Sequence, residues 1–431
     1  MTLAEDAAAL ADHAARGEDR LAALPAPPAR DAAQRDEAAA AHDASRRTRR
    51  RFLARHADAV YDLLTDDRTR RARLPDLVFA AADRFPGLVP TRRQMDAERA
   101  HVQADKEGRE IDQGIFCAAV LRSRRAGTHL IETMLTPTAR ATELLDEFRR
   151  TGRTELGSVL IERDGPAAHV EFRNGDRLNS EDNRLIADLE TAVDLALLDD
   201  QVRVGVLRGG RVAHRKYAGR RVFSAGVNLA DLCDGAISFV EFMLGRELGY
   251  VHKLLRGVLV DDANGGAWAD RSVQKPWVGA VDAFAIGGGM QLLLVLDRVI
   301  AESGAYFSLP AAHEGIVPGL GNLRLGRWSG ARTARRVILG GHRVDATDPE
   351  ATLLCDEVVA PDDMDAAIGR AVHDLAAPAV SANRRMLTLA EEPIDLYREY
   401  LAEFAAVQAS RVYAPDVLAK VEHRRRDRAA R

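Results

Sequence analysis

Two glycine-marked turns carry residue types that could stabilise negative charge developing on a substrate. The first spans Phe223–Leu229, and the second spans Ala285–Gln291, which contains three consecutive glycines. Each turn follows an apolar, strand-like run, and the second leads directly into a helical run. Backbone N–H groups at such turns can point at a ligand, and a helix N-terminus adds positive potential there. Two of these N–H groups aimed at one point would form an oxyanion hole for a carbonyl oxygen, although either turn alone is also compatible with a structural tight turn.

The segments around the turns alternate between strands and helices. A hairpin is expected around Asp164-Gly165-Pro166, with a helix over Ser180–Leu198 that has Glu181 in its first turn. Short apolar runs predict further strands over Val202–Arg208, Pro276–Asp282 and Arg298–Glu302. Another apolar run predicts a buried helix over Met290–Asp297. This alternation indicates stacked βαβ units and an α/β fold.

The two ends of the chain differ from the central segments in composition and in the spacing of apolar residues. Ala7–Ala15, Asp31–Asp58 and Thr128–Thr151 are rich in Ala, Leu, Arg and Glu with three- and four-residue apolar spacing, so we expect helices. The helical texture returns over Met364–Arg424. The sequence therefore predicts three regions: an N-terminal helical domain (1–153), a core (154–360) and a C-terminal helical region (361–431).

Composition excludes several classes of protein. With 431 residues, 46% of them hydrophobic, and no apolar run near twenty residues, the chain is expected to be globular and not membrane-spanning. No basic–apolar–small leader opens it, so a cytoplasmic location is expected. The net charge of −4 gives no case for nucleic acid. Its three cysteines lie far apart, which argues against a zinc site or a disulfide framework.

The paired turns, in this order and at this separation, resemble the crotonase (enoyl-CoA hydratase/isomerase) superfamily. The resemblance implies a spiral of ββα repeats over about residues 155–400, with the N-terminal helical domain as an addition. It also implies C-terminal helices that trimerise, and hence a homo-oligomer, either a trimer or a dimer of trimers. The oxyanion donors would be the N–H groups of Val227 and Gly288, holding the thioester oxygen of an acyl-CoA.

Two acid–base positions of the family hydratases are changed. The resemblance places glutamates where this chain has Gln291 and, after Pro310, Ala311. Paired carboxylates suit general acid–base work, so their loss argues against a hydratase while leaving the oxyanion donors in place. Glu314 and His313 stand nearby. Glu314 is either a replacement base or an ion-pair residue, and His313 is either structural or catalytic.

The segments Val222–Leu229, Phe239–Tyr250 and Ser272–Gln291 further resemble one branch of the superfamily, the cofactor-independent dioxygenases that act on (3,5-dihydroxyphenyl)acetyl-CoA in glycopeptide-antibiotic assembly. Residues matching the substrate site of that branch are Glu181, Arg246 and Gln291. From the sequence alone, Glu181 is equally well explained as a carboxylate favoured by a helix dipole. Arg246 is equally well explained by a surface ion pair with Glu241 or Glu247.

Two insertions border the predicted site. Arg211–Arg221 is strongly basic and would either face the phosphates of coenzyme A or form a solvated loop. The second, Val260–Gln274, would border the acyl pocket.

The resemblance implies oxygenation of (3,5-dihydroxyphenyl)acetyl-CoA to 3,5-dihydroxyphenylglyoxylate and free coenzyme A, with dioxygen as co-substrate and no metal or other cofactor. No two-His-one-carboxylate spacing and no G-x-G-x-x-G fingerprint is present in the sequence. The residues by themselves indicate only a stabilised acyl-CoA enolate. Two alternatives stay open: an enoyl-CoA isomerase or hydratase that uses Glu314, and a non-catalytic acyl-CoA-binding subunit. The sequence does not identify the base for the α-proton, the ring substitution pattern or the route of oxygen.

Overall fold

The chain divides into two units, a helical unit and an α/β unit. The structure, a computed structural model, describes residues 2–260 and 271–429. The helical unit consists of three segments: the chain up to Met134, Leu229–Gly245, and the chain from Ile394 onward. The α/β unit takes Leu135–Asn228 and Arg246–Pro393. Both units are discontinuous along the chain, whereas the sequence predicts three consecutive regions, so that three-part division stays a prediction.

The helical unit consists of helices whose starts are fixed by side-chain caps. Thr2 with Glu5, and Asp31 with Gln34, form capping boxes at the first two helices, so each pair satisfies N–H groups that a helix start leaves open. The α-helices of this unit are α1 (Leu3–Ala22), α2 (Ala32–Leu64), α3 (Leu74–Arg84), α4 (Arg92–Arg99), α5 (Glu110–Arg122), α6 (Arg124–Met134), α9 (Leu229–Cys233), α18 (Ile394–Arg411) and α19 (Pro415–Ala429). Shorter helical turns are η1 (Pro27–Ala29), η2 (Gln103–Asp105) and the π-helical η4 (Phe239–Leu244).

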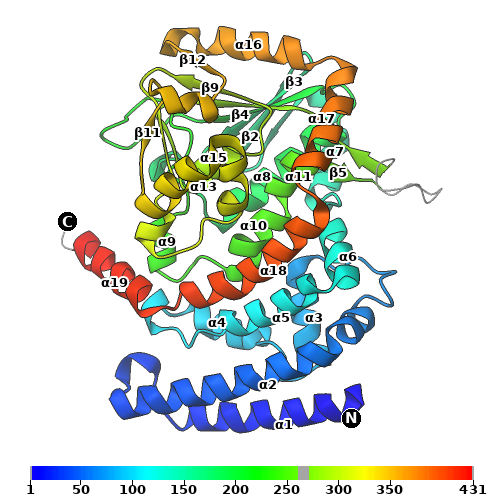
Figure 1. The fold of residues 1–431 in the computed structure, drawn as a ribbon, viewed down its shortest axis with the longest axis vertical. Coiled ribbons are helices and arrows are strands. Elements are labelled where there is room, and N and C mark those ends of the chain that lie inside the picture. The colour runs from blue at the N-terminus through cyan, green and yellow to red at the C-terminus, as the bar shows by residue number, and fades with distance from the viewer. Residues whose placement is uncertain (1, 261–270, 430–431) are drawn as a thin grey trace. The chain divides into compact units, whose positions relative to one another are not determined.

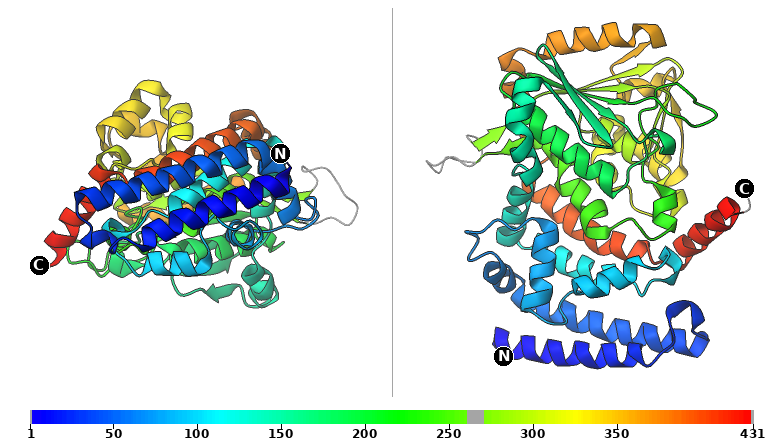
Figure 2. Two further views of the ribbon diagram at one scale, coloured as in Figure 1. Left: turned by 90° about the horizontal axis from the view of Figure 1, so that it is seen from below. Right: turned by 180° about the vertical axis from the view of Figure 1, so that it is seen from behind.

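Packing in this unit centres on α5, which is buried along most of its length and contacts both α2 and α18. The two views of Figure 2 show α1 and α2, in blue, running side by side. The helices predicted over Ala7–Ala15 and Asp31–Asp58 lie within α1 and α2. The single helix predicted over Thr128–Thr151 is wrong. Pro137 interrupts it, because proline inside a helix lacks the N–H and clashes with the preceding turn, and the helix is divided between α6 and α7 (Ala139–Thr151).

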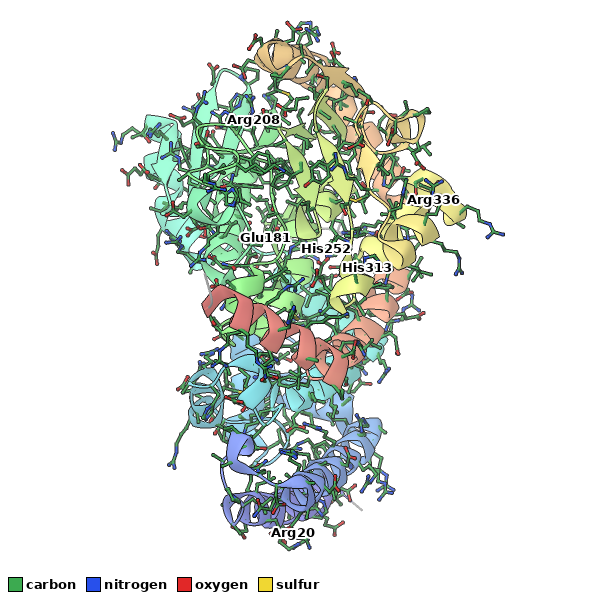
Figure 3. All side chains as sticks on the ribbon, turned by 90° about the vertical axis from the view of Figure 1, so that its left-hand side faces the viewer. Arg20, Glu181, Arg208, His252, His313 and Arg336 are labelled. Carbon is green, nitrogen blue, oxygen red and sulfur yellow. The ribbon has the colours of Figure 1, made fainter. Side chains whose placement is uncertain are left out.

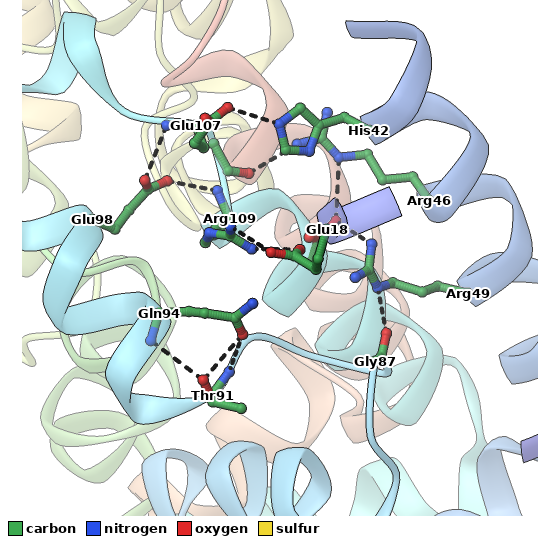
Figure 4. Close-up of polar contacts among 12 residues, drawn as sticks. Glu18, His42, Arg46, Arg49, Gly87, Thr91, Gln94, Glu98, Glu107 and Arg109 are labelled. Carbon is green, nitrogen blue, oxygen red and sulfur yellow. Dashed lines mark hydrogen bonds and ion pairs between the residues drawn. The ribbon is translucent and has the colours of Figure 1, made fainter. Parts of the chain in front are cut away.

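An ionic network joins α1, α2 and the segment before α5 (Figure 4). Arg109 donates two hydrogen bonds of 2.8 Å to the carboxylate of Glu18. Glu107 accepts from Arg30 at 2.5 Å and lies 3.0 Å from the His42 ring nitrogen. Burial alone would raise the pKa of Glu107, but hydrogen bonds from His42 and Arg30 outweigh it and lower the pKa to about 2.

The α/β unit is built on a seven-stranded sheet with the order β1-β2-β3-β4-β7-β9-β12. Its first three strands pair antiparallel, and the others are parallel to their neighbours. Its strands are β1 (Arg153–Glu155), β2 (Val159–Asp164), β3 (Ala167–Phe172), β4 (Val204–Gly209), β7 (Trp277–Val281), β9 (Arg298–Glu302) and β12 (Glu357–Val359). Two small sheets contain β11 (Val344–Asp345), β10 (Tyr306–Ser308) and β8 (Phe284–Ile286), and β5 (Val258–Leu259) and β6 (Ser272–Val273). The hairpin and the three apolar strands predicted from the sequence are confirmed, with ends shifted by one or two residues.

Helices cover both faces of the large sheet (Figure 1). On one face α16 (Met364–Leu375) packs Met364 and Ile368 against apolar residues of β4, β7 and β9. On the other face α8 (Asn183–Leu198) contacts β2, β3 and β4. The remaining helices of this unit are α7, α10 (Gly245–Leu248, shared with the helical unit), α11 (Tyr250–Arg256), α13 (Gly288–Leu293), α14 (Ala311–Glu314), α15 (Gly321–Gly340) and α17 (Pro378–Glu391), with η3 (Gly175–Arg177), η5 (Pro349–Leu353) and η6 (Pro361–Asp363).

The strands and helices repeat in a spiral. After β7, the chain adds β8 to a small sheet, forms α13 and returns to the large sheet as β9; it then adds β10 and forms α14 and α15 before β12. This is the predicted succession of ββα turns with an added helical region. The buried helix predicted over Met290–Asp297 begins earlier and ends earlier, as α13. In the described part of the chain, no helix is long and apolar enough to cross a membrane.

Candidate active site

Backbone hydrogen bonds join the two glycine turns directly. Ser224 N–H donates to the Phe284 carbonyl at 3.3 Å, and Ile286 N–H donates to the Ser224 carbonyl at 2.9 Å. Ser224 and Ala285 thereby form a parallel bridge between the turns. Gly226 has φ +77°, and a Cβ on it would lie only 2.9 Å from the Gly288 nitrogen. Glycine is required at 226 because only glycine allows both this backbone conformation and this close approach.

The amides of Val227 and Gly288 lie at this junction. Glu181 N–H donates to the Gly226 carbonyl at 2.7 Å, and Asn228 N–H donates to the Glu181 carbonyl at 2.8 Å, so Val227 is bridged on both sides. Gly288 is the first residue of α13. In the described residues, no protein hydrogen bond uses the N–H of either Val227 or Gly288. Both amides are therefore available to a ligand, and the second one has the positive end of a helix behind it.

Glu181 lies beside these amides as half of a buried ion pair. It is 2% exposed and lies in the interior of the α/β unit, where Figure 3 labels it. Arg246, 4% exposed, donates from Nε to both carboxylate oxygens, at 3.0 Å and 3.1 Å. The prediction that Glu181 lies in the first turn of a helix is wrong: Asp182 caps α8, which begins at Asn183, and Glu181 is extended backbone bridged to Val227. Arg246 is not a surface residue either, and Glu241 pairs elsewhere, with Arg99.

The same guanidinium links Glu181 to the second turn. Arg246 Nη2 donates to the Gly288 carbonyl at 2.9 Å, and Nη1 lies 3.3 Å from Oε1 of Gln291. Three predicted substrate-site residues and the two predicted amide donors are thus brought together by short contacts. Arg246 fixes the relative positions of the carboxylate and the amide side chain, since one planar group with several donors contacts both.

Two further residues belong to this cluster: Tyr250, which the sequence analysis missed, and Glu247, which it named as a possible surface ion-pair partner of Arg246 and which forms that pair in the interior. The phenol of Tyr250, 1% exposed, donates to Oε1 of Glu181. Glu247, 2% exposed, accepts from Arg246 Nη1 at 2.6 Å. Tyr250 follows Arg246 by four residues, but the two lie on separate helices divided at Gly249, so helical spacing alone does not bring them together.

Neighbouring groups of the cluster shift the pKa values of Arg246 and Tyr250. Burial alone would lower the pKa of Arg246, but Glu181, Tyr250 and Glu247 raise it above its ordinary value, so the guanidinium stays charged. Burial, with Glu181 and Glu247 nearby, raises the pKa of Tyr250 well above its usual range. Tyr250 therefore remains a protonated phenol that can donate a hydrogen bond.

The second acid–base position of the family hydratases holds no carboxylate. Ala311 opens α14 and is buried, and His313 and Glu314 follow on the same short helix. The His313 ring lies against the backbone of Gly341, where a Cβ would be 2.3 Å from its Cε1 atom. A role for His313 or Glu314 in the site stays a prediction.

The basic insertion is partly engaged within the α/β unit. Arg220 pairs with Glu302 at 2.7 Å and Arg221 with Glu171 at 2.6 Å, while Arg215 and Lys216 are exposed. Most of the second insertion, residues 261–270, lies outside the described residues. Among residues 2–260 and 271–429, no group of three or more His, Cys, Asp or Glu side chains is arranged to hold a metal ion.

The chemistry that this arrangement supports is stabilisation of a carbonyl oxygen as it gains negative charge. Two open amides belong to turns that are hydrogen-bonded to each other, and the one carboxylate beside them is neutralised by a guanidinium. Preorganised donors of this kind are worth about 3 kcal/mol each to an oxyanionic transition state.

Comparison with known proteins agrees with the fold. The sequence profile of the enoyl-CoA hydratase/isomerase family matches residues 267–393. The chain belongs to this family, the crotonase superfamily. Within it, the chain is 55% identical over 416 residues to the (3,5-dihydroxyphenyl)acetyl-CoA 1,2-dioxygenase of Amycolatopsis orientalis, an alignment that covers 96% of this chain and 95% of that protein. It is 30% identical over 245 residues to a probable enoyl-CoA hydratase of Rhizobium meliloti, covering 54% of this chain and 84% of that protein.

Among solved structures, an enoyl-CoA hydratase from Mycobacterium avium subsp. paratuberculosis superimposes with a TM-score of 0.51 at 19% identity. The match covers 62% of this chain and 99% of that one. It shows the common fold, and it leaves more than a third of this chain without a counterpart there. The dioxygenase alignment, in contrast, extends over nearly the whole chain.

Proposed function

We propose that the protein is a cofactor-independent dioxygenase that converts (3,5-dihydroxyphenyl)acetyl-CoA and dioxygen into 3,5-dihydroxyphenylglyoxylate and free coenzyme A. One observation carries this proposal above all: the amides of Val227 and Gly288 are retained in joined turns, while Gln291 and Ala311 replace both hydratase carboxylates. The near full-length similarity to the Amycolatopsis dioxygenase supports the same conclusion.

The reaction begins at the α-carbon of the thioester. The Val227 and Gly288 amides hold the carbonyl oxygen, so loss of an α-proton leaves an enolate whose charge is shared with the oxyanion hole and the aryl ring. The electron-rich α-carbon then reduces dioxygen and forms a C–O bond, which gives a peroxide. The peroxide attacks the thioester carbonyl, the C–S bond breaks, and coenzyme A leaves as the thiol. Loss of the remaining α-proton from the cyclic peroxide then breaks the O–O bond and leaves a ketone at the α-carbon and a carboxylate beside it.

Atoms and electrons balance without another reactant. The α-carbon passes from CH2 to a ketone, a four-electron oxidation, and dioxygen is reduced by the same four electrons. One oxygen atom becomes the keto oxygen and the other enters the carboxylate. Of the two α-hydrogens, one ends on the thiol and one is released as a proton.

The side chains around the amides supply binding and polarity. Glu181 accepts a hydrogen bond from a ring hydroxyl, and Arg246 neutralises that carboxylate and orients Gln291. Gln291 offers an amide where a carboxylate would repel the developing enolate. We further propose that the enzyme needs no metal or flavin, assembles as a trimer or a dimer of trimers through its C-terminal helices, and works in the cytoplasm.

Oxygen consumption with (3,5-dihydroxyphenyl)acetyl-CoA tests the proposal. We expect stoichiometric uptake of dioxygen, release of the thiol, and an aryl α-keto acid. With isotopically labelled dioxygen, the product should carry two labelled atoms, after allowance for exchange of the ketone with water. A carboxylate labelled only from water would mean thioester hydrolysis and would refute the dioxygenase assignment. Turnover of an enoyl-CoA without oxygen would indicate an isomerase or hydratase, and binding without turnover would indicate a silent acyl-CoA-binding subunit.

A further inference from the structure

Glu181 is held by two donors that come from consecutive helical segments on one side of it. Arg246, on α10, contacts both of its oxygens, and Tyr250, at the start of α11, contacts only Oε1. All three side chains are at least 96% buried. Because both donors hold Oε1 of Glu181, the position of the other oxygen, Oε2, is fixed as well.

That other oxygen faces the oxyanion amide. A Cβ built on Gly288 would lie 1.9 Å from Oε2 of Glu181, which places this oxygen directly against the first residue of α13. Tyr250 thus sets the direction in which Glu181 presents its second oxygen to a bound acyl group. Arg246 cannot do this alone, since its Nε is nearly equidistant from the two oxygens, at 3.0 Å and 3.1 Å.

The charges facing Glu181 give Tyr250 a second role. Arg246 pairs with two buried carboxylates, Glu181 and Glu247, so its positive charge is divided between them. The phenol supplies Glu181 with a further hydrogen-bond donor without adding charge to the site. Because Tyr250 itself stays protonated, it keeps this donor over the whole physiological pH range.

We infer that Tyr250 is a positioning residue for substrate selection: its phenol holds Glu181 turned toward Gly288, so that the carboxylate accepts a hydrogen bond from a hydroxyl on the substrate ring. The inference rests on the proposed function for the identity of that hydroxyl. Tyr250 acts through Glu181, and it selects hydroxylated over unsubstituted arylacetyl groups.

Tyr250→Phe tests this with little disturbance, because the ring stays in place and Arg246 keeps its position 5.5 Å from the ring centre. Binding is measured anaerobically by calorimetry, so no turnover is needed, with (3,5-dihydroxyphenyl)acetyl-CoA and with phenylacetyl-CoA. We expect the affinity for the dihydroxy thioester to fall about tenfold, since a hydrogen bond to a charged group is lost indirectly. The affinity for phenylacetyl-CoA should be unchanged.

Tyr413→Phe is the matched control. Tyr413 also donates to a glutamate, Glu110 at 2.7 Å, but within the helical unit. Tyr413→Phe should alter thermal stability to a similar degree as Tyr250→Phe and leave both affinities unchanged. A purely structural role for Tyr250 would make the two variants alike, and that result would overturn the inference.

A double-mutant cycle tests whether Tyr250 acts through Glu181. In Glu181→Gln, adding Tyr250→Phe should cause no further loss of affinity for the dihydroxy thioester. Additive losses, or equal losses for both thioesters, would refute the inference. Failure of the proposed function has a different signature: the unmodified protein would consume no oxygen with the dihydroxy thioester, whatever the binding data show.

Discussion

Replacing Gly288 with alanine should disable the reaction while leaving the fold intact. Gly288 has no positive φ, so alanine fits the backbone and the effect is steric. The added Cβ would lie 1.9 Å from Oε2 of Glu181 and 3.2 Å from Nη2 of Arg246. Real Cβ atoms essentially never come within 3.0 Å of another atom, so Glu181 must move by about 1 Å or α13 must tilt.

Either movement disturbs the oxyanion hole. A displacement of about 1 Å can cost roughly 100-fold in rate, and loss of one oxyanion donor costs about 100- to 1000-fold in kcat. We therefore expect Gly288→Ala to lower kcat for oxygen uptake by at least about 100-fold. Circular dichroism and thermal melting should show that the fold is kept.

Gly369→Ala provides the matched control. Gly369 lies inside α16, and a Cβ there would meet no atom within 4 Å. Alanine should stabilise the helix by up to about 1 kcal/mol and leave kcat unchanged. If Gly288→Ala keeps kcat within about threefold of the unmodified protein, an effect far below that of losing an oxyanion donor, then the amide of Gly288 is not an oxyanion donor and the site has been assigned wrongly.

Three further predictions concern charge, pH and cofactors. Gln291→Glu places a carboxylate within reach of Arg246 and beside the thioester, so turnover should fall about 100-fold. The affinity for coenzyme A, measured by calorimetry, should change little. Unchanged turnover would show that Gln291 is not part of the site. Glu107 has a folded-state pKa of about 2, below its ordinary 4.5, so its contribution to stability is present above about pH 4.5 and is lost as the pH falls toward 2. Glu107→Gln should therefore lower the free energy of unfolding by about 2 kcal/mol at pH 7 and by progressively less below pH 4.5, as followed by denaturant titration; an equal loss at all pH values would contradict this. Exhaustive chelation should leave oxygen uptake intact, and the purified enzyme should show no flavin absorbance; stoichiometric iron or copper in active protein would refute cofactor independence.

The strands of the α/β unit could be predicted from the sequence because buried strands are short apolar runs bounded by turn residues. The residues at which helices begin and end were harder to predict from the sequence. Pro137 interrupts a continuous helical pattern, and the pattern of alanine, leucine and charged residues does not show where the chain resumes. Ser180–Leu198 is helical in composition, yet Asp182 caps the helix two residues inside that range, and its capping bond to Leu185 leaves Glu181 outside.

The site was predictable to the extent that it consists of local motifs. The two glycine turns are motifs of this kind, so their amides could be named before the structure was known. Glu181, Arg246 and Gln291 come from three distant segments, and only the resemblance brought them together. Tyr250 was missed, and Glu247 was named only as a surface partner of Arg246, because burial depends on how α10 and α11 pack and not on local sequence.

The site separates a constant backbone part from a variable side-chain part. The bonds joining the two turns run between main-chain atoms of 223–224 and 282–286. Within the first turn, the Gly226 N–H donates to the Ser224 hydroxyl oxygen at 3.1 Å. None of them involves the side chains at 291 or 311, so the hydratase glutamates can be lost without loosening the oxyanion hole. What replaces them must not oppose charge on the bound oxygen, and the structure meets this condition in two ways. Gln291 is neutral, and the carboxylate of Glu181, which does lie against Gly288, is paired with Arg246. An enolate formed there would be stabilised by the amides, and no acid–base pair at 291 and 311 would direct it toward hydration. Its α-carbon is thereby left available to an electrophile such as dioxygen.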